Sequence, residues 1–249
     1  MYVNLTDPTA TWFPADLVPV TEPYSEEEFP DGKFTFSGEG YSVDFGDSGT
    51  FFHSEEILGK SLGQLLDTVP DLSLLYVIAQ GAGDYVINGS SRHERFYSSV
   101  GDDLIRGGAG DDEIFAGREY FDESRPDDGD DIMIGGGGAD GLHGGTGSDL
   151  FVFNNADGAF TDEITAFSSA DAVLVQTALA DKNGDGIIAF GGNRKCDLSS
   201  GGAIRIFTDG DKQVRSLEFD GQVTFEGVSY YVYSLVGSEG TLALVQDHF

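Results

Sequence analysis

Positively charged residues are scarce in this sequence. Its 249 residues include 13 Lys and Arg against 44 Asp and Glu, which gives a formal net charge of -31 at pH 7, and the first basic side chain is Lys33. A chain of this charge repels phosphate backbones and anionic lipid headgroups. We therefore expect neither nucleic acid nor an anionic membrane surface as a partner.

Long apolar runs and cysteines are also scarce. No stretch approaches the roughly 20 apolar residues of a membrane-spanning helix, so we expect no transmembrane segment. The first residues, MYVNLTDPTATWFPADL, have neither the basic start nor the apolar stretch of a cleavable export signal. The single cysteine, Cys196, excludes an internal disulfide, and we expect it to act as a small buried apolar residue.

The common motifs of hydrolytic enzymes are absent as well. The sequence contains no HExxH zinc helix and no GxSxG serine elbow, and its four histidines are scattered. The GDSG run at 46–49 lies between strand-like runs, where a turn is expected. A carboxylate-pair glycosidase or lyase stays open, because spacing in sequence does not fix spacing in space. The balance favours a protein that is not an enzyme.

Glycine, by contrast, is abundant and returns in a nine-residue repeat. The clearest copies are GGAGDDEIF (107–115), GGGGADGLH (135–143) and GGTGSDLFV (144–152). The frame extends upstream through 98–106, 89–97 and 80–88. One further copy begins at Ala116, is interrupted by an insertion at 118–128, and resumes as GDDIMI at 129–134. A repeat this short buries its apolar residues only by stacking copy on copy, which predicts a solenoid.

The eighth position of the repeat is apolar in every copy. Its occupants are Ile87, Phe96, Ile105, Ile114, Met133, Leu142 and Phe151. A flexible glycine-rich linker does not keep such a column. The segment is therefore predicted to be folded, with this column in its core.

The pattern GGxGxDxUx, as written in 107–115, resembles the calcium-binding nonapeptide of the RTX (repeats-in-toxin) family of secreted bacterial proteins. The resemblance implies a mainly β fold, with a right-handed parallel β-roll over residues 79–153. In such a roll the first six residues of each copy turn, the last three form a strand, and successive strands fall on opposite faces. It also implies calcium as the cofactor, because glycine turns leave carbonyls free and calcium takes roughly six to eight oxygen ligands.

In the family, each ion lies between two turns that are two copies apart, and it takes glycine-region carbonyls and sixth-position aspartates. The resemblance implies full sites at Asp103/Asp131, Asp131/Asp149 and Asp112/Asp140, a weaker one at Glu94/Asp112, and fading calcium loading toward Tyr85. The roll would thus hold about three to four ions. The expected ligating residues are Gly101, Asp103, Gly108, Gly110, Asp112, Gly129, Asp131, Gly136, Gly138, Asp140, Gly145, Gly147 and Asp149.

A separate loop, DKNGDGII (181–188), places Asp181, Asn183 and Asp185 in the order of an EF-hand calcium loop. Its twelfth position is Gly192, where an EF-hand carries a bidentate glutamate. This loop could bind one more calcium ion, or it could be a plain turn, and the sequence leaves both interpretations open.

Electrostatics predicts that calcium controls folding. Carboxylates stacked about 5 Å apart repel by roughly 3 kcal/mol per pair at an effective dielectric of about 20. Calcium at about 100 times its dissociation constant stabilises the folded state by about 2.7 kcal/mol per site. We therefore expect the roll to stay loose in a low-calcium cytosol and to fold outside the cell.

The flanks differ in texture from the repeats. Residues 1–78 are predicted to form an N-terminal arm and cap, with a hairpin from KFTF (33–36) and YSVDFG (41–46) and a helix over 55–69. Residues 154–249 are predicted to form a C-terminal antiparallel β cap. In it, runs such as AIRIFTD (203–209), RSLEF (215–219), VTFEG (223–227) and YYVYSLV (230–236) alternate with DG or G turns.

These features predict a secreted, extracellular or cell-surface bacterial protein with a structural, surface-associated or adhesive role. The resemblance implies type I secretion, for which the tail at 240–249 is a partial match to the signal. Candidate partners are a polysaccharide, which the cluster Tyr230, Tyr231 and Tyr233 would stack against, or a second copy of the chain. The alternatives are a small secreted hydrolase or lyase with its site in the C-terminal segment, and the export and folding module of a larger RTX toxin or enzyme.

Overall fold

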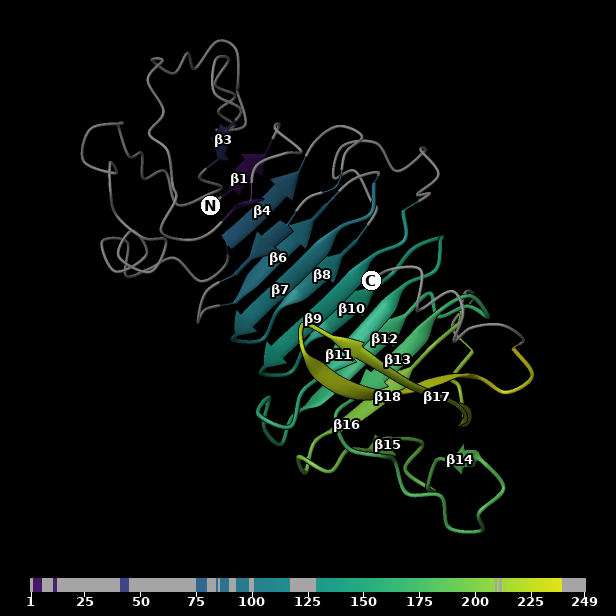
Figure 1. Cartoon of the computed structure of the whole chain (residues 1–249). Coiled ribbons are helices and arrows are strands. Elements are labelled where there is room, and N and C mark those ends of the chain that lie inside the picture. The colour runs from purple at the N-terminus through teal and green to yellow at the C-terminus, as the bar shows by residue number, and fades with distance from the viewer. Residues whose placement is uncertain are drawn as a thin grey trace.

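The computed structural model of the chain describes residues 2–5, 11–12, 41–44, 75–79, 84, 86–89, 93–98, 101–116, 129–208, 210 and 212–238. These residues form strands, turns and loops and include no helix, so the predicted mainly β class is confirmed (Figure 1). No helix in these ranges is long and apolar enough to cross a membrane. Several predictions lie outside the described residues: the helix at 55–69, the strand at 33–36, Tyr85, the insertion at 118–128 and the tail at 240–249.

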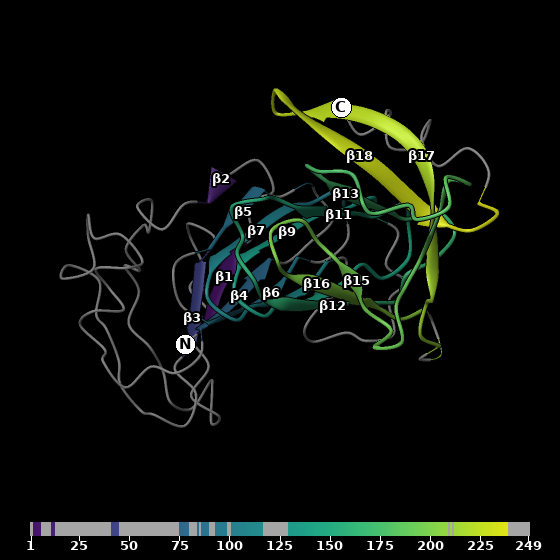
Figure 2. The same ribbon diagram turned by 90° about the horizontal axis from the view of Figure 1, so that it is seen from below.

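The described residues form two nine-stranded sheets, which lie face to face (Figure 2). Sheet A runs in the order β15-β16-β12-β10-β8-β6-β4-β1-β3, and sheet B in the order β14-β17-β18-β13-β11-β9-β7-β5-β2. The strands of sheet A are β15 (Cys196–Asp197), β16 (Ala203–Ile206), β12 (Thr161–Thr165), β10 (Gly141–His143), β8 (Glu113–Phe115), β6 (Glu94–Tyr97), β4 (Leu75–Ala79), β1 (Tyr2–Leu5) and β3 (Tyr41–Asp44). The strands of sheet B are β14 (Ile187–Ala189), β17 (Ser216–Phe225), β18 (Val228–Leu235), β13 (Ala172–Val175), β11 (Leu150–Phe153), β9 (Ile132–Gly137), β7 (Leu104–Ala109), β5 (Val86–Asn88) and β2 (Thr11–Trp12).

Consecutive copies of the repeat alternate between the sheets, as predicted. The strands β5, β7, β9 and β11 pair in parallel in sheet B, whereas β6, β8 and β10 pair in parallel in sheet A. Their register is that of the nine-residue frame, with Phe96 opposite Ile114 and Ile114 opposite Leu142. Parallel stacking continues past the repeats, because β12 pairs with β10 and β13 pairs with β11. This arrangement is consistent with a β-roll.

The eighth-position column forms the core between the sheets. All seven of its residues, from Ile87 to Phe151, are at most 1% exposed, which confirms the prediction. The column continues beyond the repeats as Ile164 and Val173, both fully buried. Cys196 joins the same core at 2% exposure, and burial raises the pKa of its thiol to about 12, so it acts as a small apolar residue.

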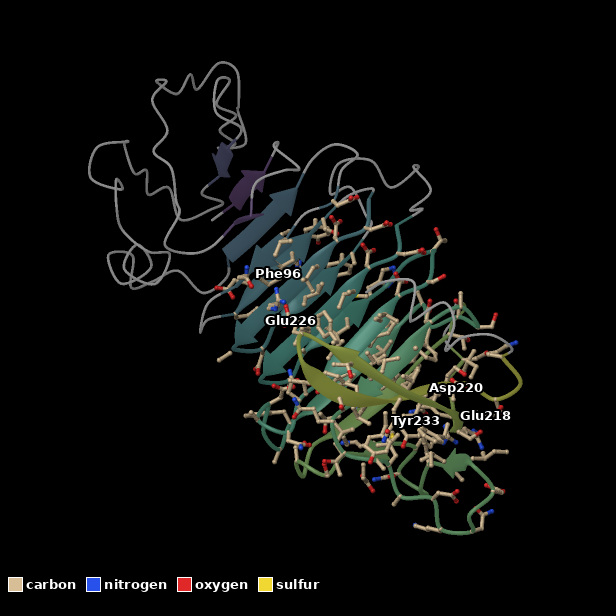
Figure 3. All side chains as sticks on the ribbon, viewed as in Figure 1. Phe96, Glu218, Asp220, Glu226 and Tyr233 are labelled. Carbon is tan, nitrogen blue, oxygen red and sulfur yellow. The ribbon has the colours of Figure 1, made fainter. Side chains whose placement is uncertain are left out.

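The hairpin of β17 and β18 belongs to sheet B and folds back over the outer face of that sheet. A second apolar cluster joins the hairpin to the repeats there. In that cluster Ile132, Leu150 and Val152 of the repeats pack with Phe225 and Val232 of the hairpin. Figure 2 shows the hairpin arching over β9 and β11, and Figure 3 labels Glu226 at its turn. The Glu226 carboxylate pairs there with the Arg106 guanidinium of β7.

The C-terminal runs differ in detail from the predicted antiparallel cap. The strand β16 pairs in parallel with β12, although it pairs antiparallel with β15. The sequence Asp220-Gly221, expected as a turn, is a β-bulge that keeps β17 continuous. Gly221 takes a φ of 147°, which suits a bulge rather than a reversal of the chain. The reversal comes instead at Glu226 and Gly227, with φ of 49° and 80°, as a two-residue turn.

Candidate metal centres

The sixth-position acidic residues of the repeats are buried at the ends of the turns, just before or at the start of each strand. Asp103, Asp112, Asp131, Asp140 and Asp149 are between 0% and 3% exposed. Glu94, at the same position, is fully buried. Burial of so many carboxylates demands partners, because an isolated ionised carboxylate in a protein interior is strongly unfavourable.

A ladder of hydrogen bonds joins these carboxylates along each side of the roll. In each step the main-chain N–H of one acidic residue donates to the Oδ1 atom of the acidic residue two copies later. The distances are 2.8 Å for Glu94 to Asp112, 2.8 Å for Asp112 to Asp140, 2.8 Å for Asp103 to Asp131 and 3.1 Å for Asp131 to Asp149. The structure thus brings together the residue pairs that the sequence predicted.

The fifth-position residues form a second ladder that runs in the opposite direction. Here the N–H of the later copy donates to the carboxylate of the earlier one: Asp102 to Asp84 at 3.1 Å, Asp130 to Asp102 at 2.9 Å, and Ser148 to Asp130 at 2.7 Å. Asp84 and Asp102 are exposed. These two fifth-position carboxylates therefore stay in water and that of Asp130 is half-buried, whereas the sixth-position carboxylates are buried.

The glycines of the turns are required by their backbone angles and by close approach. Gly101, Gly110, Gly138 and Gly147 have φ between 123° and 140°, a region that side chains disfavour. A Cβ on Gly138 would lie 1.7 Å from the carbonyl oxygen of Gly110, two copies earlier. Three further glycines of the predicted ligand set have positive φ: Gly108, Gly136 and Gly145. A Cβ added to Gly129 would lie 2.1 Å from the carbonyl oxygen of Gly101.

The second oxygen of the buried carboxylates is the clearest sign of a cation. The Oδ2 atoms of Asp112 and Asp140 are buried and accept no hydrogen bond. Each faces the first glycine of its own copy, so that a Cβ on Gly107 or Gly135 would lie 2.5 Å or 2.4 Å away. A buried carboxylate oxygen that accepts no hydrogen bond suits a metal ligand better than a structural hydrogen bond.

The pKa values of these aspartates show that burial disfavours their ionised form. Burial raises the pKa of Asp112 from 3.8 to about 8, opposed by the hydrogen bond from the Glu94 N–H and reinforced by the charges of Glu94, Asp140 and Asp111. Burial likewise raises the pKa of Asp140 to about 6. Without a cation these groups are driven toward the neutral form.

Calcium fits this donor set. Within the described ranges no three His, Cys, Asp or Glu side chains converge on one point. An ion would therefore be held by pairs of carboxylates and completed by main-chain carbonyls, an all-oxygen shell of the kind calcium prefers and zinc does not. Each ion would be held by turn carbonyls and by one pair of carboxylates: Asp103/Asp131, Asp131/Asp149 or Asp112/Asp140. The charge of the ions would stabilise the ionised form of these carboxylates.

Sequence reasoning missed two members of these columns. Asp162 accepts the Asp140 N–H at 3.0 Å, and Asp171 accepts the Asp149 N–H at 3.0 Å. Both follow turns that lack the glycine pattern, so the nine-residue frame does not reach them. A signal was present nonetheless: each precedes a core residue by two positions, as Asp140 precedes Leu142.

The loop at 181–188 holds itself together by hydrogen bonds. Asp181 accepts the N–H groups of Asn183 and Gly184 through Oδ1 and that of Gly186 through Oδ2. These bonds lower the pKa of its carboxyl group, those from Gly186 and Gly184 most strongly. Calcium at this loop stays a prediction.

Stacked nine-residue repeats, glycine turns and buried carboxylate columns are the features of calcium-binding repeat proteins. Comparison with protein families agrees: residues 88–119 and 127–151 match the RTX calcium-binding nonapeptide repeat in four copies. The chain carries RTX calcium-binding nonapeptide repeats, as the sequence indicated, and such repeats bind calcium. Neither a curated protein nor a solved structure matches the chain significantly.

Proposed function

We propose that this is a secreted bacterial protein whose β-roll is loose inside the cell and folds when it binds calcium outside. The observation that carries the proposal is the pair of buried Oδ2 atoms, on Asp112 and Asp140, that accept no hydrogen bond. Each carboxylate is placed by one hydrogen bond and leaves its other oxygen for a cation. Extracellular calcium modules typically bind at about 0.1 to 1 mM, far above the free calcium of a cytosol.

The roll would be right-handed and hold three to four ions at the predicted pairs, with the weakest at Glu94/Asp112. Glu94 supports a weaker site because its longer side chain departs from the aspartate pattern, although its N–H keeps the ladder bond to Asp112 at 2.8 Å. The N-terminal residues and the C-terminal strands would close the two ends of the roll. The unit boundaries at residues 78 and 153 are part of this proposal.

The role we favour is structural, surface-associated or adhesive, with export through type I secretion. A calcium-loaded β-roll in a chain with a net charge of -31 would suit display at a cell surface, where calcium could bridge acidic surfaces. The fifth-position ladder adds exposed carboxylates, such as Asp84 and Asp102, in a row along one edge.

The test is far-UV circular dichroism of the whole chain, stripped of calcium and then titrated with it. We expect a cooperative gain of β signal at about 0.1 to 1 mM calcium. A spectrum that is already native without calcium and does not change on titration would contradict the proposal. Magnesium at the same concentrations is the control for simple charge screening, and it should give little gain.

Localisation needs its own experiment in the producing bacterium. We expect the protein in the medium or on the cell surface, released from cells by a chelator wash. Retention inside the cell, with none exported, would contradict the secreted role while leaving calcium binding intact.

A further inference from the structure

Asparagine is followed by glycine at two places in this chain, Asn88–Gly89 and Asn183–Gly184. At such a pair the side-chain amide can be lost without an enzyme, because glycine has no side chain to keep its main-chain nitrogen away from the asparagine Cγ atom. The reaction requires the main chain to turn until that nitrogen meets Cγ. The local structure therefore decides which of the two pairs reacts.

The pair Asn88–Gly89 is held in the parallel ladder of sheet B. Asn88 is half-buried at the end of β5 and stands in register with Arg106 of β7. The Gly89 N–H donates to the Arg106 carbonyl at 2.7 Å, and the Asn88 Oδ1 atom accepts a hydrogen bond from the Arg106 guanidinium at 3.4 Å. A Cβ on Gly89 would lie 2.0 Å from the carbonyl oxygen of Gly107. The nitrogen that would attack is therefore fixed in the sheet, with main chain packed against it.

The pair Asn183–Gly184 lies in the loop before β14 and is not part of a strand. Both residues are exposed, Gly184 has a φ of 75°, and a Cβ on Gly184 would meet no atom within 4 Å. The hydrogen bonds of Asn183 stay within the loop, because its N–H donates to Asp181 Oδ1 at 3.2 Å and its Nδ2 atom to Asp185 Oδ2 at 2.8 Å. The main chain at this pair therefore has space to turn.

One contact opposes the reaction at Asn183. The Gly184 N–H donates to the Asp181 Oδ1 atom at 2.8 Å, and this bond must open before the nitrogen attacks. The bond is exposed, so water replaces either partner at little net cost. Surface loops open far more often than strands inside a sheet. The contact slows the reaction at Asn183, whereas attack at Asn88 requires the sheet itself to open.

We propose that Asn183 is a site of spontaneous deamidation and that the sheet protects Asn88. The Gly184 nitrogen forms a bond to the Asn183 Cγ atom and gives up its proton, the Cγ–Nδ2 bond breaks, and Nδ2 leaves with a proton as ammonia. Water then opens the cyclic imide and leaves aspartate or isoaspartate at position 183. The reaction consumes water only and needs no oxidant or cofactor.

The modification adds a negative charge to a loop that already holds Asp181 and Asp185. It replaces the Nδ2 donor by a carboxylate oxygen, so the bond to Asp185 Oδ2 is lost and two carboxylates repel each other there. The loop leads directly into β14, and the Gly186 carbonyl accepts the Phe219 N–H at 2.9 Å. The edge of sheet B at β14 should therefore loosen as the protein ages.

The test follows both pairs in the whole chain, incubated folded in saturating calcium at mildly alkaline pH. Peptide mapping by mass spectrometry measures aspartate and isoaspartate at positions 88 and 183 over time. The same chain in denaturant gives the rate of each pair without structure. We expect position 183 of the folded chain to react within about tenfold of its denatured rate, and position 88 to react at least about a hundredfold more slowly than its own.

A folded chain in which position 183 stays intact overturns the proposal, and so does equal reaction of the two pairs. Asn183→Gln is the matched control, because glutamine keeps the amide but its longer side chain does not close the same ring. It should stay unmodified at this position.

The effect on β14 is tested with Asn183→Asp, which carries the charge of the product from the start. We expect faster amide hydrogen exchange in β14 of Asn183→Asp than in that of Asn183→Gln. Equal exchange in the two variants would overturn the loosening of this edge and leave the modification site to be judged by the mapping.

Discussion

Neighbouring acidic residues in one turn have opposite environments, and this contrast explains why the repeat keeps both. Asp112 is 1% exposed, whereas Asp111 beside it is exposed. Asp111 accepts the N–H of Ala139 in the later copy, while Asp112 accepts that of Glu94 in the earlier one. Each turn is thus tied in both directions along the roll, and of these two carboxylates only that of Asp112 is buried.

The substitution Asp112→Asn should therefore have two opposite effects. Without calcium it should leave stability unchanged or raise it, because a buried charge is removed and the accepting oxygen is kept. At calcium about 100 times its dissociation constant it should cost about 2.7 kcal/mol for each site lost. Chemical denaturation in calcium measures the loss, and far-UV circular dichroism of the calcium-free variant measures the gain.

Asp111→Asn is the matched control, with the same change of charge one residue away on the exposed side. It should alter stability in calcium by less than about 0.5 kcal/mol. Equal losses in the two variants would mean that net charge, and not ligation, governs the response.

Much of the candidate metal centre could be predicted from the sequence, because the repeat places its acidic residues at fixed positions. The pairing of Asp103 with Asp131 and of Asp112 with Asp140 follows from the frame alone, and the structure joins both pairs. Asp162 and Asp171 could not be predicted in this way. Their turns have other lengths and lack the glycines, so only tertiary stacking brings them into line.

At the scale of elements, the turns depend on glycines that have no room for a side chain. Gly138→Ala should destabilise the roll strongly, by at least the roughly 1–3 kcal/mol of an unfavourable backbone region. The further cost comes from a Cβ that would meet the Gly110 carbonyl at 1.7 Å. Thermal unfolding in saturating calcium measures the loss.

Gly141→Ala provides the comparison within the same copy. Gly141 lies in β10, its φ is not positive, and the nearest atom to an added Cβ is 3.8 Å away. This variant should be neutral or more stable by about 0.5 kcal/mol, because alanine restricts the unfolded chain. A Gly138→Ala protein as stable as Gly141→Ala would contradict the close stacking of the turns.

The hairpin of β17 and β18 is the element whose placement the sequence analysis missed. Its strands were predicted from alternation, but their position over sheet B was not. The evidence was present in the repeats: the seventh and ninth positions are apolar in β9 and β11, which have both faces buried. In β8 and β10 those positions are half-exposed. Alternation alone does not reveal which distant segment covers such a face.

Two phenylalanines of this hairpin test its docking. Phe225 is 7% exposed and belongs to the cluster on the outer face of sheet B, so Phe225→Ala should cost about 3 kcal/mol or more. Phe219 is 41% exposed and contacts Tyr231 and Tyr233, with ring centroids 6.0 Å and 5.5 Å away. Phe219→Ala should cost about 1 kcal/mol. Denaturant midpoints in calcium measure both, and equal costs would argue against a docked hairpin.

At the scale of the whole molecule, protons should partly replace calcium. The folded, metal-free chain holds Asp112 with a pKa of about 8 and Asp162 with a pKa of about 7, against 3.8 for an ordinary aspartate. The folded state therefore binds more protons than the unfolded one. The stability that these two groups contribute is fully present below pH 3.8 and is lost as the pH rises through about 7 to 8.

We expect the calcium-free chain to show more β signal and a higher denaturant midpoint at about pH 5.5 than at about pH 8.5. Calcium affinity should change the other way, because protons compete for the ligands as the pH falls. Circular dichroism at the two pH values, before and after calcium addition, checks both signs. A calcium-free chain that is equally unfolded at both would contradict the burial of these carboxylates.

The hairpin over sheet B also sets an order of events during synthesis. The bond between Arg106 and Glu226 joins residues 120 positions apart, and the apolar strip of Ile132, Leu150 and Val152 has no cover until residues 216–235 have been made. The strip is therefore synthesised well before the strands that cover it. The last strands to be synthesised thus complete the outer layer of the roll.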